Sequence, residues 1–263
     1  MNGRFAGKKV SAVGLAVVLF VIVAAAVALS RWHAAPIIMY HHVSPDNTAR
    51  PDTVSPRRFE WQMAYLKANH FNVLSLSELV QAAREGKPLP RKSVAITFDD
   101  GYEDNYTHAF FVLKKYHFPA TIFVISDVIN TPGFLTTAQI KEMTAQGIEI
   151  GSHTRRHVYL PEIPKDQLAD EITGSKRKLE TELGIRINHF CYPSGGFNEG
   201  IKEIVRQSGY VSASTTNRGN DRSGRDVYEL KRVRLSDADR HVTDLWMKLT
   251  GLYSLSRRDK SPY

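Results

Sequence analysis

A short apolar run, Ser93–Phe98, ends in two aspartates and a glycine, and it restricts the fold of this 263-residue chain more than any other stretch. Both sides of the run are largely apolar, which predicts a strand buried on both faces, as in a parallel sheet. Asp99 and Asp100 then stand at the carboxyl end of the strand, where α/β folds place their binding loops. Adjacent residues of an extended chain point to opposite sides, so the two carboxylates are expected to have different roles.

Strand-like and helix-like segments alternate along the rest of the chain. Strands are expected at Ile37–Tyr40, Asn72–Leu74, Ala120–Val124, Ile148–Ile150, His189–Tyr192, Val211–Ser214 and Leu230–Leu235. Helices are expected at Pro56–Asn69, Ser77–Arg84, Asn105–Tyr116, from Thr136 to before Gly147, and at Lys165–Leu183, Asn198–Ser208 and Asp237–Thr250. This alternation implies parallel βαβ units, and five or six of them suggest a closed or partly open barrel.

The N-terminal run Val10–Leu29 is apolar apart from Ser11, and basic residues flank it. A helix of this length spans about 30 Å, the thickness of a bilayer's hydrocarbon core, so we expect a retained membrane anchor. Three basic residues before the run and one after it place the N-terminus in the cytoplasm. The expected organisation is a cytoplasmic stub, anchor and linker over 1–35, a folded domain over 36–250 outside the membrane, and a basic tail over 251–263. Cleavage of the anchor would release the domain as a secreted protein.

Composition narrows the remaining choices. The net charge is +8, from 35 Lys and Arg against 27 Asp and Glu, and the basic residues are spread over several predicted helices. Spread charge usually solvates a surface, and no nucleic-acid-binding motif accompanies it. The one cysteine, Cys191, excludes an intrachain disulfide.

A second polar motif follows the predicted strand Ile148–Ile150. His153 and His157 are four residues apart, so on a helical turn both imidazoles would lie on one face and could reach one metal ion. Two histidines and a carboxylate leave positions on the ion open, as in catalytic zinc sites. Asp-Gly by itself is a common turn dipeptide, and His-x-x-x-His by itself is a weak signal. The aspartate pair at one predicted strand end together with the histidine pair at another indicates a metal site. A non-haem iron oxygenase shares this ligand set, although the βα order and the aspartate pair disfavour it.

These motifs resemble a known family. Thr-Phe-Asp-Asp at 97–100 and His-Thr-Arg-Arg-His at 153–157 are similar to the first two motifs of the polysaccharide deacetylases, the NodB-homology carbohydrate esterases. Met-Tyr-His-His-Val at 39–43 resembles more particularly the branch of poly-N-acetylglucosamine deacetylases. The resemblance covers about 36–235. It implies a deformed parallel (β/α) barrel and metal-dependent removal of acetyl groups from sugars.

The resemblance also implies roles for individual residues. Asp100, His153 and His157 would hold one divalent ion, zinc before cobalt or nickel, and Asp99 would be the catalytic base. Phe-Cys-Tyr-Pro-Ser-Gly-Gly at 190–196 takes the place of the third motif, so the backbone N–H of Ser194 would be the oxyanion donor.

Two departures from the family pattern concern the partners of these residues. Cys191 stands where many members have an arginine that orients the catalytic aspartate, and Arg232 or Arg234 is expected to replace it. The late histidine of a Leu-x-His motif, the usual general acid, is missing because 230–232 read Leu-Lys-Arg. The candidates for the acid are His41 or His42, which follow a strand, and His241 on a predicted helix. Tyr102 is a further candidate for the lining of the site.

The predicted function is therefore that of a metal-dependent hydrolase, membrane-anchored, that removes N-acetyl groups from an N-acetylated polysaccharide at the cell surface. An O-acetyl carbohydrate esterase would use the same site and stays an alternative. The second alternative is a non-catalytic polysaccharide-binding or assembly protein, because the late histidine is missing and Cys191 replaces an arginine. An Asp99 that does not bind the ion favours an enzyme, since a structural metal site has no use for it.

Overall fold

The computed structural model describes residues 35–46, 50–219 and 226–250. Within these ranges no helix is both long and apolar enough to cross a bilayer. The anchor expected at Val10–Leu29 and the tail at 251–263 lie outside the described residues.

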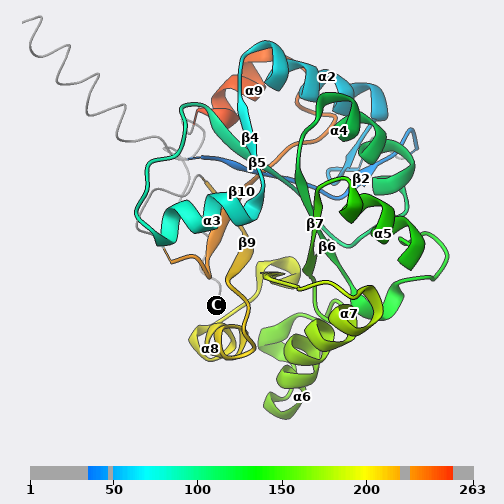
Figure 1. The fold of residues 1–263 in the computed structure, drawn as a ribbon, viewed down its shortest axis with the longest axis vertical. Coiled ribbons are helices and arrows are strands. Elements are labelled where there is room, and N and C mark those ends of the chain that lie inside the picture. Colours follow the sequence, from blue (N-terminus) through cyan, green and yellow to red (C-terminus); the bar gives the residue numbers. More distant parts are fainter. Residues whose placement is uncertain (1–34, 47–49, 220–225, 251–263) are drawn as a thin grey trace, which may run out of the picture. The chain divides into compact units, whose positions relative to one another are not determined.

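Seven parallel strands of the described chain close into a barrel (Figure 1). Around the ring they are β1 (Ile37–Tyr40), β5 (Ser93–Phe98), β6 (Ala120–Val124), β7 (Ile148–Ser152), β8 (His189–Cys191), β9 (Ser212–Arg218) and β10 (Leu230–Arg234), which pairs with β1. An eighth strand, β4 (Asn72–Leu74), pairs with the first half of β5, and β6 pairs with the end of β5. The predicted deformed (β/α) barrel is confirmed, and the extra strand accounts for part of its irregularity.

Helices surround the barrel (Figure 1). They are α2 (Pro56–Ala68), α3 (Leu76–Arg84), α4 (Phe111–Tyr116), α5 (Thr137–Ala145), α6 (Lys165–Ala169), α7 (Ser175–Leu183), α8 (Glu199–Gln207) and α9 (Val242–Leu249). Two π-helical runs, η1 (Asn105–Phe110) and η4 (Asp170–Gly174), continue into α4 and α7, and short 3-10 turns form η2 (Ser126–Val128), η3 (Leu160–Glu162) and η5 (Pro193–Gly195). The helix expected at Ser77–Arg84 is present as α3 and begins one residue earlier, at Leu76, because Ser75 and Glu78 form a capping box.

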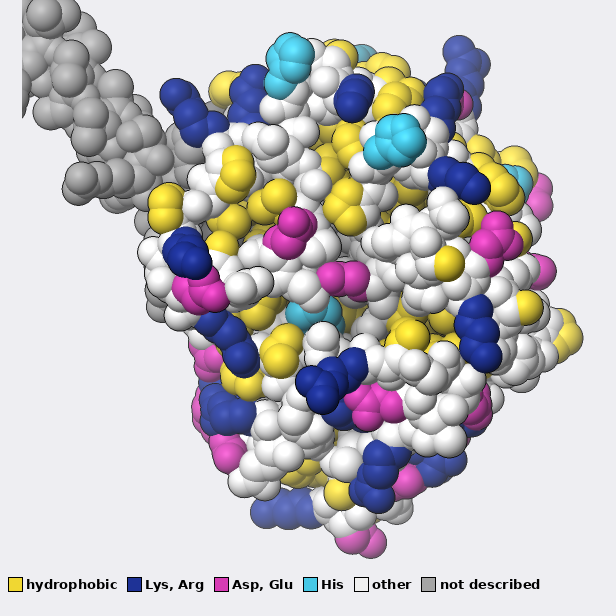
Figure 2. All heavy atoms as spheres, viewed as in Figure 1, with side chains coloured by type: hydrophobic (Ala, Val, Ile, Leu, Met, Phe, Trp, Pro, Cys, Tyr) yellow, Lys and Arg dark blue, Asp and Glu magenta, His cyan; other side chains and the backbone are white. Residues whose placement is uncertain are grey.

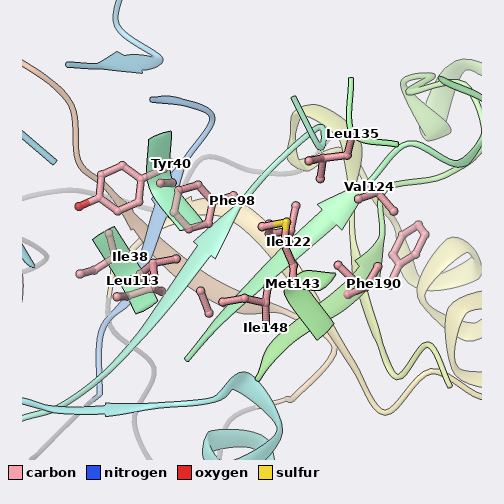
Figure 3. Packing of buried hydrophobic residues seen from close by; sticks show 14 of the residues in the cluster. Ile38, Tyr40, Phe98, Leu113, Ile122, Val124, Leu135, Met143, Ile148 and Phe190 are labelled. Atoms are coloured by element: carbon pink, nitrogen blue, oxygen red, sulfur yellow. The ribbon is translucent and has the colours of Figure 1, made fainter. Parts of the chain in front are cut away.

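Alternation of side chains along the strands separates two apolar clusters. The outer cluster lies between strands and helices and includes Ile38, Phe98 and Ile122 (Figure 3). The inner cluster fills the barrel with side chains that have the opposite parity, such as Ile37, Ala95, Phe123 and Cys191. Leu76, Leu79 and Val80 of α3 pack into the inner cluster, and Ser77 contacts His189 at the start of β8, so α3 covers the amino end of the barrel.

Three expectations about the elements were wrong. The final helix begins at Val242, not at Asp237, because the Asp237 carboxylate accepts hydrogen bonds from the amide and hydroxyl of Ser55, the N-cap of α2. Strand β9 (Ser212–Arg218) extends four residues beyond the expected strand Val211–Ser214. Between the expected strand Ile37–Tyr40 and the expected helix at Pro56, where no further strand was expected, lies a short parallel pair, β2 (His42–Val43) with β3 (Thr53–Val54).

The surface carries interspersed charges. Figure 2 shows Lys and Arg mixed with Asp and Glu over the visible face, with apolar side chains between them. On this face the basic side chains are therefore interspersed with acidic ones and do not form one continuous basic patch.

Candidate active site

The predicted site residues gather at the carboxyl end of the barrel. Asp99 and Asp100 follow β5, His153 follows β7, and the backbone amide of Asp99 extends the ladder by donating to the Tyr40 carbonyl. The chain then turns sharply, with Asp100 at φ 73° and Gly101 at φ 75°. A Cβ on Gly101 would lie 2.8 Å from Val124 Cγ1, so glycine is required here by both its φ and its close approach to β6.

Three ligand atoms converge on one point beside this turn. His153 Nε2 and His157 Nε2 lie 3.4 and 3.3 Å from Asp100 Oδ1. Bonds of 2.0–2.1 Å in tetrahedral geometry place neighbouring ligands about 3.3 Å apart, so the spacing fits one zinc-sized ion. Asp100 Oδ1 is buried and accepts no hydrogen bond from a described residue, which is the state expected of a ligand atom. The residues therefore fit a divalent metal.

A second grouping of possible ligands, Asp99, His153 and Cys191, fits less well. Both oxygens of Asp99 already bind Arg232. His153 Nδ1 lies 2.8 Å from the Cys191 carbonyl, which can only accept, so Nδ1 carries the proton and Nε2 is left for an ion on the Asp100 side. Burial raises the pKa of the Cys191 thiol and disfavours the thiolate that would bind metal.

The segment His153–His157 is a loop, and the expectation of a helical turn was wrong. Thr154 and His157 have φ of 66° and 58°, in the left-handed region, so the chain reverses between the two histidines. The Thr154 hydroxyl accepts from the His157 amide at 3.0 Å and stabilises this reversal. The loop still brings both Nε2 atoms to Asp100, by a different geometry from the one expected.

Arg232 supplies the arginine that the third motif lacks. It is fully buried inside the barrel, and Nη1 and Nη2 donate to the two oxygens of Asp99 at 2.6 and 2.7 Å. Its remaining donors bind the Thr215 carbonyl, the Thr97 hydroxyl and, at 3.0 Å, Cys191 Sγ. All five N–H donors are thus used. Of the two candidates it is Arg232 that contacts Asp99, whereas Arg234 lies one repeat farther along β10 and is half-buried.

Electrostatics set the protonation of the two acid–base candidates. Burial by itself raises the pKa of Asp99, but the Arg232 guanidinium outweighs it and holds the pKa well below the ordinary value. Asp99 is therefore ionised at neutral pH. Burial lowers the pKa of His41, against the opposing pull of Asp99 and Asp100, so His41 is neutral at rest. Its Nε2 lies 3.8 Å from Asp99 Oδ2.

The other two histidine candidates for the general acid, His42 and His241, contact other residues instead of Asp99. His42 stacks on Tyr102 at 3.7 Å between ring centroids, and its Nδ1 pairs with Asp104 at 2.7 Å. Tyr102 in turn stacks on Phe134, so these rings form one wall beside the site. His241 is exposed at the start of α9, where its amide donates to the Asp244 carboxylate.

Ser194 follows β8 in η5, so it lies at the same end of the barrel as the histidines. Its φ of 54° is left-handed, and strained backbone of this kind is concentrated at functional sites. Sequence reasoning missed Asp104, which orients His42 and also accepts from the Val43 amide. Its position shortly after the Asp-Asp-Gly turn was the one available signal.

Comparison with known proteins agrees with this geometry. Residues 86–213 match the family model described as polysaccharide deacetylase. The chain is 37% identical over 201 residues to the Bacillus subtilis protein YxkH, named as a polysaccharide deacetylase, covering 76% of this chain and 71% of that protein. It is 30% identical over 199 residues to a Staphylococcus epidermidis poly-beta-1,6-N-acetyl-D-glucosamine N-deacetylase, covering 70% and 68%. The Streptococcus pyogenes deacetylase PplD, solved with acetate, superposes with a TM-score of 0.77 at 30% identity over 83% of this chain and 99% of that one. The chain belongs to the polysaccharide deacetylase family with the NodB-homology fold.

Proposed function

We propose that this protein removes N-acetyl groups from an N-acetylated amino-sugar polysaccharide at the cell surface, using one divalent ion held by Asp100, His153 and His157. The observation that carries the proposal is that two adjacent aspartates have different partners. Asp100 faces two imidazole nitrogens, and the adjacent Asp99 is held by Arg232 and kept ionised. The names of the staphylococcal and streptococcal relatives support a deacetylase, and the first of them supports an N-acetylated sugar polymer.

A bound divalent ion supplies Lewis acidity, which polarises the acetyl carbonyl and acidifies a water. Asp99 accepts the proton of the attacking water, because it is ionised and has lone pairs beyond those bound by Arg232. Arg232 fixes the orientation of that carboxylate. The backbone N–H of Ser194 donates to the oxyanion that forms from the carbonyl oxygen.

His41 completes the transfer of the proton to the leaving amine. Protonated Asp99 is a strong acid because Arg232 favours its ionised form, so its proton passes readily to the neutral imidazole of His41. Protonated His41 then donates to the amine nitrogen as the carbon–nitrogen bond breaks. The products are acetate and the free amino sugar, and Asp99 returns to its ionised state.

Arg232 also weakens the non-catalytic alternative. That alternative rested partly on Cys191 in the place of an arginine, and an arginine from β10, two strands away from β8 around the barrel, occupies the space beside Asp99. An O-acetyl esterase remains compatible with the same residues, so substrate choice is decided by the experiment.

The experiment measures acetate released from N-acetylglucosamine oligomers and from an O-acetylated glycan by the purified protein, loaded with Zn²⁺ or treated with chelator. The controls are Asp99→Asn and Asp166→Asn, the second on an exposed position of α6. Release from the oligomers that requires both Zn²⁺ and Asp99, and that survives Asp166→Asn, is the expected result. Release from the O-acetylated glycan alone would replace the proposal by the esterase, and no release from either would favour a binding protein.

The proposed location outside the membrane rests on the sequence of Val10–Leu29. The full chain is expected in the membrane fraction, and a variant that lacks residues 1–30 is expected in the soluble fraction with the same turnover. A full chain that fractionates as soluble with its N-terminus intact would contradict a retained anchor.

A further inference from the structure

Glu171 is a fully buried acid outside the site described above. It belongs to the π-helical run η4, and no part of the mechanism uses it. Its Oε2 accepts hydrogen bonds from the backbone amides of Arg155 and Arg156 at 3.0 and 3.1 Å. Its Oε1 accepts from Arg156 Nε at 2.6 Å. A buried carboxylate is costly unless it is paired and hydrogen-bonded, and here every bond goes to one loop.

That loop is the segment between the two histidine ligands. Arg155 and Arg156 lie between His153 and His157, and the backbone reverses there through left-handed Thr154 and His157. Left-handed residues other than glycine persist only where surrounding contacts fix them. The position of His157 Nε2 relative to Asp100 therefore depends on what holds this backbone.

Two elements hold the loop from opposite sides. On one side η2 donates its amides, Ser126 to the Thr154 carbonyl at 3.1 Å and Asp127 to the Arg155 carbonyl at 3.0 Å. On the other side Glu171 accepts the amides of Arg155 and Arg156. The carbonyl groups of the loop thus accept from η2, and its amide groups donate to the carboxylate of Glu171. The backbone is therefore held by hydrogen bonds through both its acceptors and its donors.

The π-helical geometry of η4 explains how this helix can reach the loop. A π turn contains one residue more than an α turn and is often found at functional sites. Two neighbours, Asp170 and Glu171, both reach Arg155: Asp170 binds the guanidinium through Nη1 at 2.6 Å, and Glu171 binds the backbone amide. Next on the same helix, the Ser175 hydroxyl lies 2.7 Å from that of Ser152, at the end of β7. The helix contacts the chain on both sides of His153.

We propose that Glu171 is a positioning residue for the metal site: its carboxylate holds the His153–His157 loop so that both imidazoles face Asp100 before the ion binds. The proposal rests on the metal site of the proposed function and goes beyond it, because Glu171 contacts neither the ion position nor the substrate. It acts through the backbone, so its loss weakens metal binding without removing a ligand.

The test measures Zn²⁺ affinity by competition with a chromophoric chelator, together with the thermal midpoint of the metal-free protein. Glu171→Gln keeps the size of the side chain but replaces one of the two accepting oxygens by an NH2 group, which cannot accept a hydrogen bond from the N–H donors of the loop. The dissociation constant for Zn²⁺ is expected to rise about 10- to 100-fold, and turnover is expected to recover largely at saturating Zn²⁺. Glu182→Gln, at an exposed position of α7, is the matched control and is expected to leave both values unchanged. Arg156→Gln removes the guanidinium bond only, so its effect is expected to be smaller than that of Glu171→Gln.

A folded Glu171→Gln protein with wild-type Zn²⁺ affinity would overturn the proposal, even if its thermal midpoint falls, because that result describes a purely structural role. Should the variant fail to fold, hydrogen exchange of the metal-free wild-type protein gives the answer. Protected amides at Arg155 and Arg156 support a loop that is held before metal binds, and unprotected amides refute it.

The proposed function can fail separately. A wild-type protein that binds Zn²⁺ but releases no acetate would refute the deacetylase and leave the affinity test of Glu171 intact. A wild-type protein that binds no divalent ion would overturn both.

Discussion

Replacement of Arg232 by methionine is the most informative perturbation of this site. The guanidinium is completely buried, as is Asp99, and two hydrogen bonds of 2.6 and 2.7 Å join them. Arg232→Met removes the cation but leaves the carboxylate inside the barrel. Removing one partner of a buried ion pair costs about 3–5 kcal/mol, because the other charge stays buried without compensation. For a domain of this size each kcal/mol lowers Tm by about 2–4 °C, so a fall of about 6–20 °C is expected near neutral pH.

The pH dependence separates the charge effect from a packing effect. In the wild-type protein the folded-state pKa of Asp99 is depressed, so its stabilising contribution is present above the ordinary pKa and is lost as pH falls through the folded value. Arg232→Met removes the charge that lowers the pKa of Asp99 most, so burial, the largest single influence, raises the folded-state pKa against the weaker opposing pull of His41 and His153. Ionisation then destabilises the variant above that pKa. The difference in unfolding free energy between the two proteins should therefore be largest at about pH 7 and shrink at about pH 4.

The assay is urea unfolding of the metal-free proteins at both pH values, with acetate release measured in parallel. Arg234→Met, on the same strand but not in contact with Asp99, serves as the control and should behave like the wild type in stability. The double variant Asp99→Asn with Arg232→Met buries no charge and should recover much of the loss. A difference that is the same at both pH values, or a double variant no more stable than Arg232→Met, would refute the reasoning.

Other changes test other parts of the site. Asp99→Asn should abolish turnover and keep the metal, and loss of metal from that variant would reverse the roles given to the two aspartates. His157→Ala should lower metal affinity as well as rate, which elemental analysis and chelator competition measure; an unchanged metal content would remove this histidine from the ligand set. His41→Ala should lower kcat about 100- to 10,000-fold with normal metal content, and normal turnover would show that another group protonates the amine. Gly151→Ala should cost about 1–3 kcal/mol in urea unfolding, because the added Cβ would lie 2.5 Å from Phe123 Cδ1, and an unaltered midpoint would show that the ring moves aside freely.

The sequence could predict the barrel and the convergence of its motifs for a simple geometric reason. Parallel strands bring their carboxyl ends to one edge, so polar residues that directly follow strands, such as Asp99 and His153, must become neighbours. Identification of each strand was therefore enough to bring together residues far apart in the chain. No knowledge of the loops was needed.

The choice between Arg232 and Arg234 lay beyond the sequence. Residues two apart on a strand face the same side, so both point into the barrel, and only their depth differs. Depth depends on register, and β10 pairs with β1 so that Val233 lies opposite Ile38. This register places Arg232 below the mouth, level with Thr97 and Asp99.

Loop conformation and helix irregularity were equally hidden. Thr154 is β-branched and rarely adopts a left-handed φ, so the pattern His-x-x-x-His favoured a helical turn that the structure does not contain. Glu171 lies in a helix whose sequence suggests an exposed charged face. Glu171 lies in the π-helical run η4 and is buried, and no pattern in the local sequence indicates that the helix is π-helical there.

The position of Arg232 on the last strand has a consequence for the proposed base, Asp99. Strand β10 fills the gap between β9 and β1, so it joins the end of the domain to its beginning. Until β10 is in place, Asp99 lacks the guanidinium that binds both of its oxygens. The orientation of the proposed base therefore depends on closure of the ring by its last strand, and a C-terminal truncation that removes β10 would leave both aspartates and both histidines in the chain but no arginine beside Asp99.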